Sequence, residues 1–219
     1  MQDVHKVTRA MAQQFAESVL DGSLPDCPNC FGGQYHEQRA KVRNTWCENY
    51  EKFCEFYESE TPRWSIFAKG NEKLPFWAFS ALPGITCPGA GECLTYCYSF
   101  KAWRYPAAFY RQLQNTLLLK SAHGRQAIAA AWQALPYGQT VRLYVDGDID
   151  SLATLRYWLG LVSDRPDLKA YGYSKSWAVF QAFDRSGEEW PSNYRLNLSS
   201  GSIYGLEDKL AMEQLPITR

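Results

Sequence analysis

Residues 141–174, VRLYVDGDIDSLATLRYWLGLVSDRPDLKAYGYS, decide the fold of this chain. Val141, Leu143 and Val145 alternate with polar or amphipathic residues, which is the period of a half-buried strand that ends near Val145. Apolar residues then recur at helical spacing as far as residue 163, and residues 169–174 predict a second strand. A strand, a helix and a strand joined by short loops predict a parallel β/α unit with a right-handed crossover.

The same alternation extends in both directions along the chain. Downstream, residues 194–199 predict a third strand and residues 206–215 a last helix. Upstream, residues 76–81 (FWAFSA) predict an earlier strand, followed by helices at 106–121 and 125–135 with a break at His123-Gly124. Residues 76–219 are therefore expected to be an α/β domain whose parallel β/α units form a partial, incomplete barrel or an open sheet.

Residues 1–75 predict an N-terminal helical segment. Helices are expected at 3–20, with Asp3 as the N-cap, and at 36–58, and residues 61–75 are expected to connect to the β/α domain. No apolar run approaches the ~20 residues of a membrane span, and the N-terminus lacks the apolar core of a secretory signal. We therefore expect a cytoplasmic protein without a membrane partner. Its seven cysteines, an odd number, favour metal or redox chemistry over a disulfide framework.

Three of the cysteines lie within eleven residues in the segment 86–103, TCPGAGECLTYCYSFKAW. The glycines of its Pro-Gly-Ala-Gly run are expected to adopt positive φ angles. A helix that begins near Glu92 would place Cys93 and Cys97 on one face, with Cys87 closing over them from the loop. Three converging thiolates bind a [4Fe–4S] cluster or another soft metal centre and leave one coordination position open. The alternative is that the three side chains are small buried hydrophobes.

Four more cysteines precede this loop. Cys27 and Cys30 form a C-x2-C knuckle, which is a half-site for zinc or a cluster. Cys47 and Cys54 are separated by two helical turns, roughly 10 Å. That separation is too large for one tetrahedral metal with bonds of about 2.3 Å, so at most one of this pair joins the knuckle. The knuckle either forms a second site or completes the first, and the remaining helical cysteine either packs in the core or serves as a fourth ligand of the central cluster.

The carboxyl ends of the strands carry the active face in folds of this kind. That rule brings the cysteine loop together with the polar residues that follow the later strands. The candidate cofactor-binding residues at this edge are Asp146, Asp148, Ser174, Lys175 and Ser199. Asp146, which precedes Gly147, is the first candidate to bind a ribose or an amine. Asp150 or Ser151 is expected to cap the next helix.

A basic, aromatic stretch follows the cysteine loop, because no acidic residue occurs between Glu92 and Asp146. Lys101, Arg104 and Arg111 alternate there with tyrosine, phenylalanine and tryptophan. Such a mixture binds phosphates while its rings stack on bases, which predicts a nucleotide or nucleic acid as partner. The alternative is a helix whose rings pack inward and whose basic groups face water.

Four segments together resemble one family: LPGITCPGAGECLTYCYSFKA (82–102), VRLYVDGDIDS (141–151), LKAYGYSKSW (168–177) and YRLNLSSGS (194–202). The chain resembles the phage- and plasmid-borne gene-product-88-like family. More distantly, a three-cysteine loop after the first strand is similar to that of the radical S-adenosylmethionine (SAM) superfamily. That similarity implies a [4Fe–4S] cluster on Cys87, Cys93 and Cys97, SAM on the open iron, and Tyr98 packed near the cofactor. The spacing here is C-x5-C-x3-C, where the superfamily has C-x3-C-x2-C.

These resemblances imply an iron–sulfur protein of a mobile element, expected to be a radical-SAM-like enzyme that acts on a nucleotide or nucleic acid. The first alternative is a non-catalytic module that holds an iron–sulfur cluster or zinc and binds nucleic acid or a host protein. The second is an α/β domain whose cysteines are structural and hold no metal.

Overall fold

The computed structural model describes residues 7–28 and 40–218 of the chain, except for the side chains of residues 40–44. Within these residues one sheet contains five strands in the order β1-β2-β3-β4-β5. Strands β1 and β2 are antiparallel, and the other neighbours are parallel. The predicted α/β class is confirmed, and the sheet is open rather than closed into a barrel. The strands are β1 (Ala68–Asn71), β2 (Leu74–Ala78), β3 (Thr140–Leu143), β4 (Lys169–Ser174) and β5 (Tyr194–Leu198).

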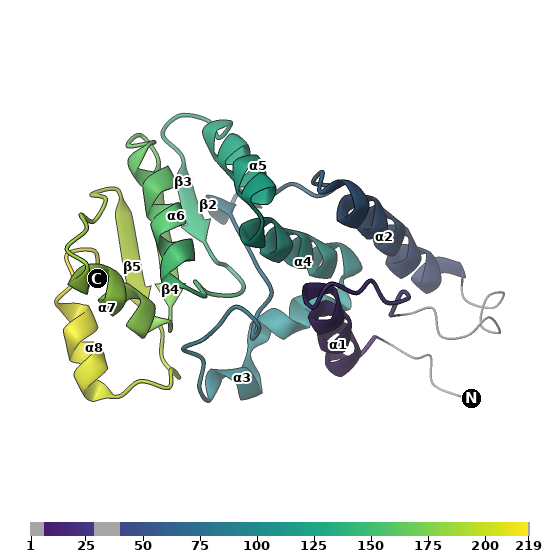
Figure 1. Ribbon diagram of the computed structural model, residues 1–219, viewed down its shortest axis with the longest axis horizontal. Helices are drawn as coiled ribbons and strands as arrows, with labels where there is room; N and C mark the ends of the chain where they lie inside the picture. Colours follow the sequence, from purple (N-terminus) through teal and green to yellow (C-terminus); the bar gives the residue numbers. More distant parts are fainter. Residues whose placement is uncertain (1–6, 29–39, 219) are drawn as a thin grey trace.

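Helices precede, connect and follow these strands (Figure 1). The described helices are α1 (Arg9–Leu20), α2 (Ala40–Ser59), α3 (Cys93–Tyr96), the 3-10 helix η1 (Tyr98–Arg104), α4 (Pro106–Lys120), α5 (Ala122–Gln133), α6 (Leu152–Ser163), α7 (Trp177–Arg185) and α8 (Leu206–Glu213). In the part of the chain that the structure describes, none of them is long and apolar enough to cross a membrane.

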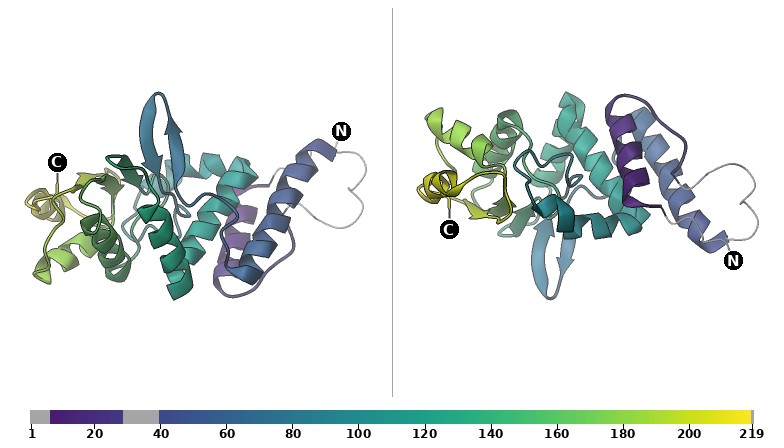
Figure 2. Two further views of the ribbon diagram at one scale, coloured as in Figure 1. Left: turned by 90° about the horizontal axis from the view of Figure 1, so that it is seen from above. Right: turned by 90° about the horizontal axis from the view of Figure 1, so that it is seen from below.

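The connecting helices cover only one face of the sheet. Strands that follow one another in both sequence and space, with right-handed crossovers, place all their connections on the same side. In Figure 2 the β1–β2 hairpin extends away from the layer of helices. Val141 and Leu143 of β3 are buried towards the helices, whereas Arg142 between them is only half-buried. Arg142 is therefore on the face without a helix layer, where the strand register places it beside Tyr171.

Helices α1 and α2 share a core with the β/α part of the chain. The ring of Tyr110 on α4 lies 5.9 Å from that of Phe15 on α1 and 5.2 Å from that of Phe53 on α2, measured between centroids. These rings belong to one hydrophobic cluster that continues to the sheet. The expected boundary between residues 75 and 76 falls inside β2.

Several predicted element boundaries are wrong. Residues 61–75 were expected to be only a connection, but they contain β1 and the beginning of β2. The strand expected at 76–81 is β2, Leu74–Ala78. Helix α1 begins at Arg9, because the Thr8 hydroxyl accepts from the Met11 amide as an N-cap; Asp3 lies outside the described residues. Strand β3 ends at Leu143 rather than near Val145, because Tyr144 adopts a left-handed φ of 57°.

The predicted break between two helices is present, but it lies at Ser121 rather than at residues 123–124. Helix α5 begins at Ala122 and runs through Gly124, whose amide donates to the capping hydroxyl of Ser121. A Cβ atom on Gly124 would lie 2.3 Å from the Leu118 carbonyl oxygen. The glycine therefore permits close packing of α5 against α4, and does not end a helix.

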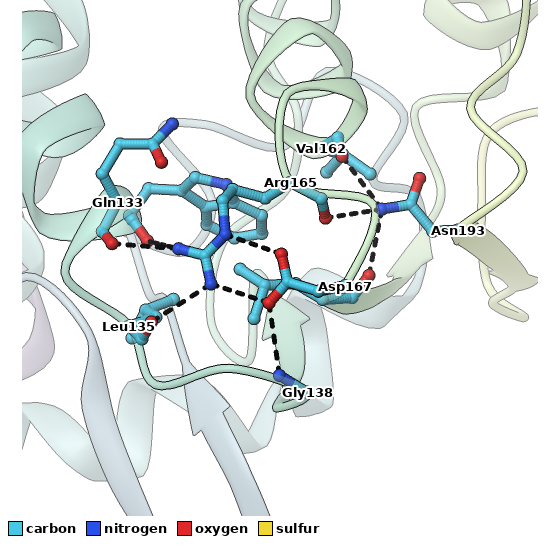
Figure 3. Close-up of polar contacts among 9 residues, drawn as sticks. Gln133, Leu135, Gly138, Val162, Arg165, Asp167 and Asn193 are labelled. Carbon is cyan, nitrogen blue, oxygen red and sulfur yellow. Dashed lines mark hydrogen bonds and ion pairs between the residues drawn. The ribbon is translucent and has the colours of Figure 1, made fainter.

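A polar cluster holds the amino ends of β3, β4 and β5 together (Figure 3). Arg165 donates to the carboxylate of Asp167 at 2.7 and 2.8 Å and to carbonyl groups at the end of α5. The side-chain amide of Asn193, just before β5, donates to the carbonyls of Val162, Arg165 and Leu168. These contacts fix the strands at one edge of the sheet, so their carboxyl ends are presented together at the opposite edge.

Candidate functional site

All three cysteines of the loop line one pocket at the carboxyl edge of the sheet, with a volume of about 410 Å³. Their arrangement differs from the predicted one. Helix α3 ends at Tyr96, and Cys97 has an extended conformation (φ −55°, ψ 116°) that leads into η1. The prediction that Cys93 and Cys97 share a helix face is therefore wrong. The pocket receives Cys93 from α3 and Cys87 and Cys97 from the segments on either side of it.

Most of the candidates predicted from the carboxyl-edge rule lie at the same place. Besides the three cysteines, the pocket is lined by Tyr98, Asp148, Lys175 and Ser199. Asp146 and Ser174 are not among the lining residues; Ser174 donates to Asp148, which is. Arg142, Tyr173 and Ser200 also line the pocket, and of these three sequence reasoning did not propose Tyr173.

Two glycines fasten the cysteine loop to the sheet. The amides of Gly91 and Cys93 donate to the carbonyl of Gly201 (3.1 and 3.4 Å), and the amide of Ile203 donates to the carbonyl of Gly89 (3.1 Å). A Cβ atom on Gly89 would lie 1.7 Å from the Lys175 carbonyl oxygen. Neither Gly89 nor Gly91 has a positive φ, so the prediction for these glycines is wrong. Pro88 and Gly89 still form a turn, which the Ala90 amide closes by donating to the Cys87 carbonyl (3.1 Å), and the absence of side chains on both glycines allows close approach of two backbones.

Asp148 organises the strand ends beneath the pocket. Its carboxylate is buried and accepts from the Ser174 hydroxyl (2.7 Å), the Lys175 amide (2.7 Å) and the Ile149 amide (2.8 Å). Burial raises the pKa of Asp148, and the hydrogen bonds from Lys175 and Ser174 oppose that rise. The residue therefore joins the end of β4 to the loop after β3 and presents an already bonded carboxylate to the pocket.

Asp146 has a different place from the one expected for a ligand-binding residue. Its carboxylate accepts from the side-chain amide of Gln112 on α4 (3.0 Å), and the Gln112 oxygen accepts from the indole of Trp103 on η1 (2.8 Å). Asp146 thus ties η1 and α4 to the end of β3, outside the pocket lining. The next helix is capped by Ser151, whose hydroxyl accepts from the Thr154 amide, as one of the two predicted caps.

The surroundings of Cys87 disfavour a free thiolate. The hydrogen bond that its sulfur accepts from the Gly84 amide, at 3.4 Å, favours the charged form, but the effect of burial is larger. Burial raises the pKa of Cys87 to about 12, and the nearby charge of Asp148 adds to the rise. At neutral pH the side chain is therefore a thiol, unless a cation compensates the thiolate charge.

Tyr98, with 59% of its surface exposed, donates its hydroxyl to the Val145 carbonyl (2.9 Å) and so joins η1 to the end of β3.

The other cysteines that the structure describes lie apart from the pocket. Cys27 is buried beside the hydroxyl of Tyr110, and Cys54 forms a hydrogen bond with Tyr50, one turn earlier on α2. Cys47 is half-buried on the same helix. None of these three lines the pocket, and Cys30 lies outside the described residues.

The basic residues after the loop divide into two environments. Lys101 and Arg104 are exposed on η1, and the Arg104 Nε donates to the Lys101 carbonyl (2.9 Å). Arg111 is half-buried on α4, where burial lowers its pKa and the carboxylate of Asp146 opposes that effect. None of the three lines the pocket.

Comparison with protein families shows to which family the chain belongs. The model of the gene product 88 family matches residues 37–215, which include the cysteine loop and all five described strands. The chain belongs to the gene product 88 family. The resemblance to this family is thus confirmed, and its model begins after Cys27 and Cys30. A search of curated proteins and a search of solved structures each found no match.

Proposed function

We propose that this gene product 88 family member holds a [4Fe–4S] cluster on Cys87, Cys93 and Cys97 and is a radical-SAM-like enzyme. In this proposal SAM occupies the open iron, and the substrate is a nucleotide or nucleic acid. The observation that carries it is that three thiols from one short loop line a single pocket at the carboxyl edge of a parallel sheet. When bound, such a cluster supplies one-electron chemistry at the iron that lacks a protein ligand.

The donor set fits a soft centre with three protein ligands. Thiolates select iron–sulfur clusters and zinc. Structural zinc sites use four protein ligands, whereas this pocket offers three thiols, and Cys27, Cys47 and Cys54 lie elsewhere. Asp148, the carboxylate that lines the pocket, already accepts three hydrogen bonds. Within the described residues no three Cys, His, Asp or Glu side chains are already gathered as a metal-binding group, so binding would draw the thiols closer together.

The chain's own residues prepare this site in two ways. The Gly84 amide donates to the Cys87 sulfur, which favours negative charge on that atom. The contacts of Gly89 and Gly91 with the ends of β4 and β5 hold the loop against the sheet, so that the sulfurs are presented with little backbone freedom. The exposed Lys101 and Arg104 on η1 supply positive charge for the phosphates of a nucleic acid.

Anaerobic purification and reconstitution test the proposal. The wild-type chain is expected to show a broad brown absorbance and about four irons and four sulfides per chain. Each of Cys87→Ala, Cys93→Ala and Cys97→Ala is expected to lose most of the iron. Cys47→Ala is the matched control, because it removes a half-buried thiol that does not line the pocket.

The outcomes of the metal analysis separate the candidate functions. One zinc per chain with no iron would instead support a non-catalytic metal module that binds nucleic acid or a host protein. Absence of both metals, or equal iron in Cys47→Ala and the three loop variants, would refute the cluster. If iron is retained, a titration with SAM monitored in the visible spectrum then tests the open coordination position.

A further inference from the structure

Two cations line the pocket, and the proposed cluster does not use them. Arg142 comes from β3 on the sheet face without a helix layer, and Lys175 directly follows β4. Both side chains are half-buried. A cation that is partly removed from water is normally paired with a carboxylate or with hydrogen-bond acceptors.

Arg142 lacks such a partner among the described residues. Its Nε atom is buried without a hydrogen-bond acceptor, and the salt bridges of the described chain involve other arginines. The guanidinium lies over the ring of Tyr173, 4.9 Å from its centroid. The ring holds the guanidinium in place through a cation–π contact and satisfies none of its N–H donors. Buried donors of this kind are rare, and each requires an explanation such as a missing ligand.

Lys175 is positioned in a similar way. Its backbone amide donates to Asp148, but its ammonium group has no hydrogen bond or salt bridge within the described residues. The salt bridges of the described residues do not include one between this ammonium group and the carboxylate of Asp148, whose oxygens accept from Ser174, Ile149 and the Lys175 amide. The hydroxyls of Ser199 and Ser200, which also line the pocket, are further possible donors.

Arg195 provides a comparison with an arginine on the same sheet face, outside the pocket. It lies on β5, on the same sheet face, in register with Tyr171. Its guanidinium donates to the carbonyls of Ser192 (3.0 Å) and Tyr194 (2.8 Å), and it does not line the pocket. On this face, then, Arg195 outside the pocket donates to two backbone carbonyls, whereas the Nε of Arg142 in the pocket has no acceptor among the described residues.

We infer that Arg142 and Lys175 form a subsite for an oxyanion, a carboxylate or a phosphate, on the ligand that occupies the pocket. Tyr173, 44% exposed, fixes the guanidinium on one side and offers ring surface to the rest of that ligand. Two sources supply this chemistry: the carboxylate of an amino-acid-bearing ligand such as SAM, and the phosphate of a nucleotide. The inference rests on the proposed function for the choice of these ligands, while the subsite itself rests on the two cations and not on the cluster.

Binding to the purified full-length chain, measured by calorimetric titration, tests the subsite with two matched ligand pairs. AMP and adenosine differ by a phosphate, and S-adenosylhomocysteine and its carboxamide differ by the charge of a carboxylate. Charge-assisted hydrogen bonds make us expect the charged member of at least one pair to bind about tenfold tighter or more. Arg142→Gln and Lys175→Met should each reduce that preference severalfold, and Arg142→Lys, which keeps a cation, should retain part of it.

Matched control variants show whether the loss is local. Arg195→Gln removes a cation from the same sheet face, and Lys169→Met removes one from the amino end of β4; both should keep the preference. A preference in the AMP pair identifies a phosphate, and one in the S-adenosylhomocysteine pair identifies a carboxylate. Equal affinity within both pairs, no binding by any of the four compounds, or an unchanged preference in Arg142→Gln and Lys175→Met would overturn the inference. Iron content of the cysteine variants is measured independently, so failure of the cluster proposal is distinguishable from failure of the subsite.

Discussion

Gly89→Ala is the most direct test of how the cysteine loop is built. The added Cβ would lie 1.7 Å from the Lys175 carbonyl oxygen, 2.4 Å from the Lys175 carbonyl carbon and 2.9 Å from the Ser176 Cα. All three atoms belong to the backbone, so no side-chain rotation relieves the overlap. Restoring ordinary contact distances requires the loop and the end of β4 to separate by about 2 Å.

The expected magnitude follows from the contacts that this separation breaks. Overpacking of this kind destabilises by about 1–3 kcal/mol. The hydrogen bond from the Ile203 amide to the Gly89 carbonyl and that from the Gly91 amide to the Gly201 carbonyl contribute about 0.5–1.5 kcal/mol each. We expect the free energy of unfolding to fall by about 3 kcal/mol, which lowers Tm by about 6–12 °C for a chain of this size.

Thermal denaturation followed by circular dichroism gives the Tm, and the rate of reaction with a thiol reagent reports whether buried Cys93 has become accessible. Gly160→Ala is the control, because a Cβ there meets no atom within 4 Å and alanine favours the helix α6. It should leave Tm unchanged or slightly raised. If Gly89→Ala melts with the wild type and its thiols react no faster, the close-approach argument is refuted.

Three further predictions concern other parts of the molecule. Asp148→Asn turns one acceptor oxygen into a donor that faces an N–H or O–H group. Denaturant unfolding at pH 7 should therefore show a free energy of unfolding lower by about 1–3 kcal/mol. If the variant is as stable as the wild type, the carboxylate does not organise the strand ends. For Asp167, hydrogen bonding to Arg165 lowers its pKa to about 2. The ionised carboxylate therefore stabilises the folded chain above the ordinary aspartate pKa near 4, and this stabilisation is lost as pH falls towards 2. The difference in urea midpoint between wild type and Asp167→Asn should shrink over that interval, and a constant difference contradicts the pairing. The double variant Lys101→Ala/Arg104→Ala should weaken nucleic-acid binding and lower the salt slope by about two, measured by fluorescence anisotropy at several salt concentrations; an unchanged slope means that these groups only face water.

The sequence predicted the fold class because its evidence is local. The alternation at residues 141–145 and the helical spacing that follows are properties of neighbouring residues, and parallel strands joined by short crossovers have a fixed hand. The rule that ligands bind at the carboxyl ends of such strands then placed Asp148, Lys175 and Ser199 with the three cysteines, as the pocket lining shows. The predictions that were wrong concern features that depend on contacts between residues far apart in the sequence. Helix α3 stops before Cys97, and Gly89 packs closely against Lys175 without the positive φ that was expected.

By itself, then, the sequence determined that this chain is an α/β protein with a cysteine loop at the carboxyl edge of its sheet, because period and topology are encoded within each β/α unit. Only the tertiary structure decided that Asp148 faces the pocket while Asp146 supports α4, and that Arg142 lines the pocket with a buried donor that has no acceptor among the described residues. In the sequence Arg142 is an ordinary polar residue of an alternating strand. Whether such a residue meets water, an acid or a pocket depends on which side of the sheet the helices cover and on what the neighbouring strands present there, and both are set by packing between residues far apart in the chain.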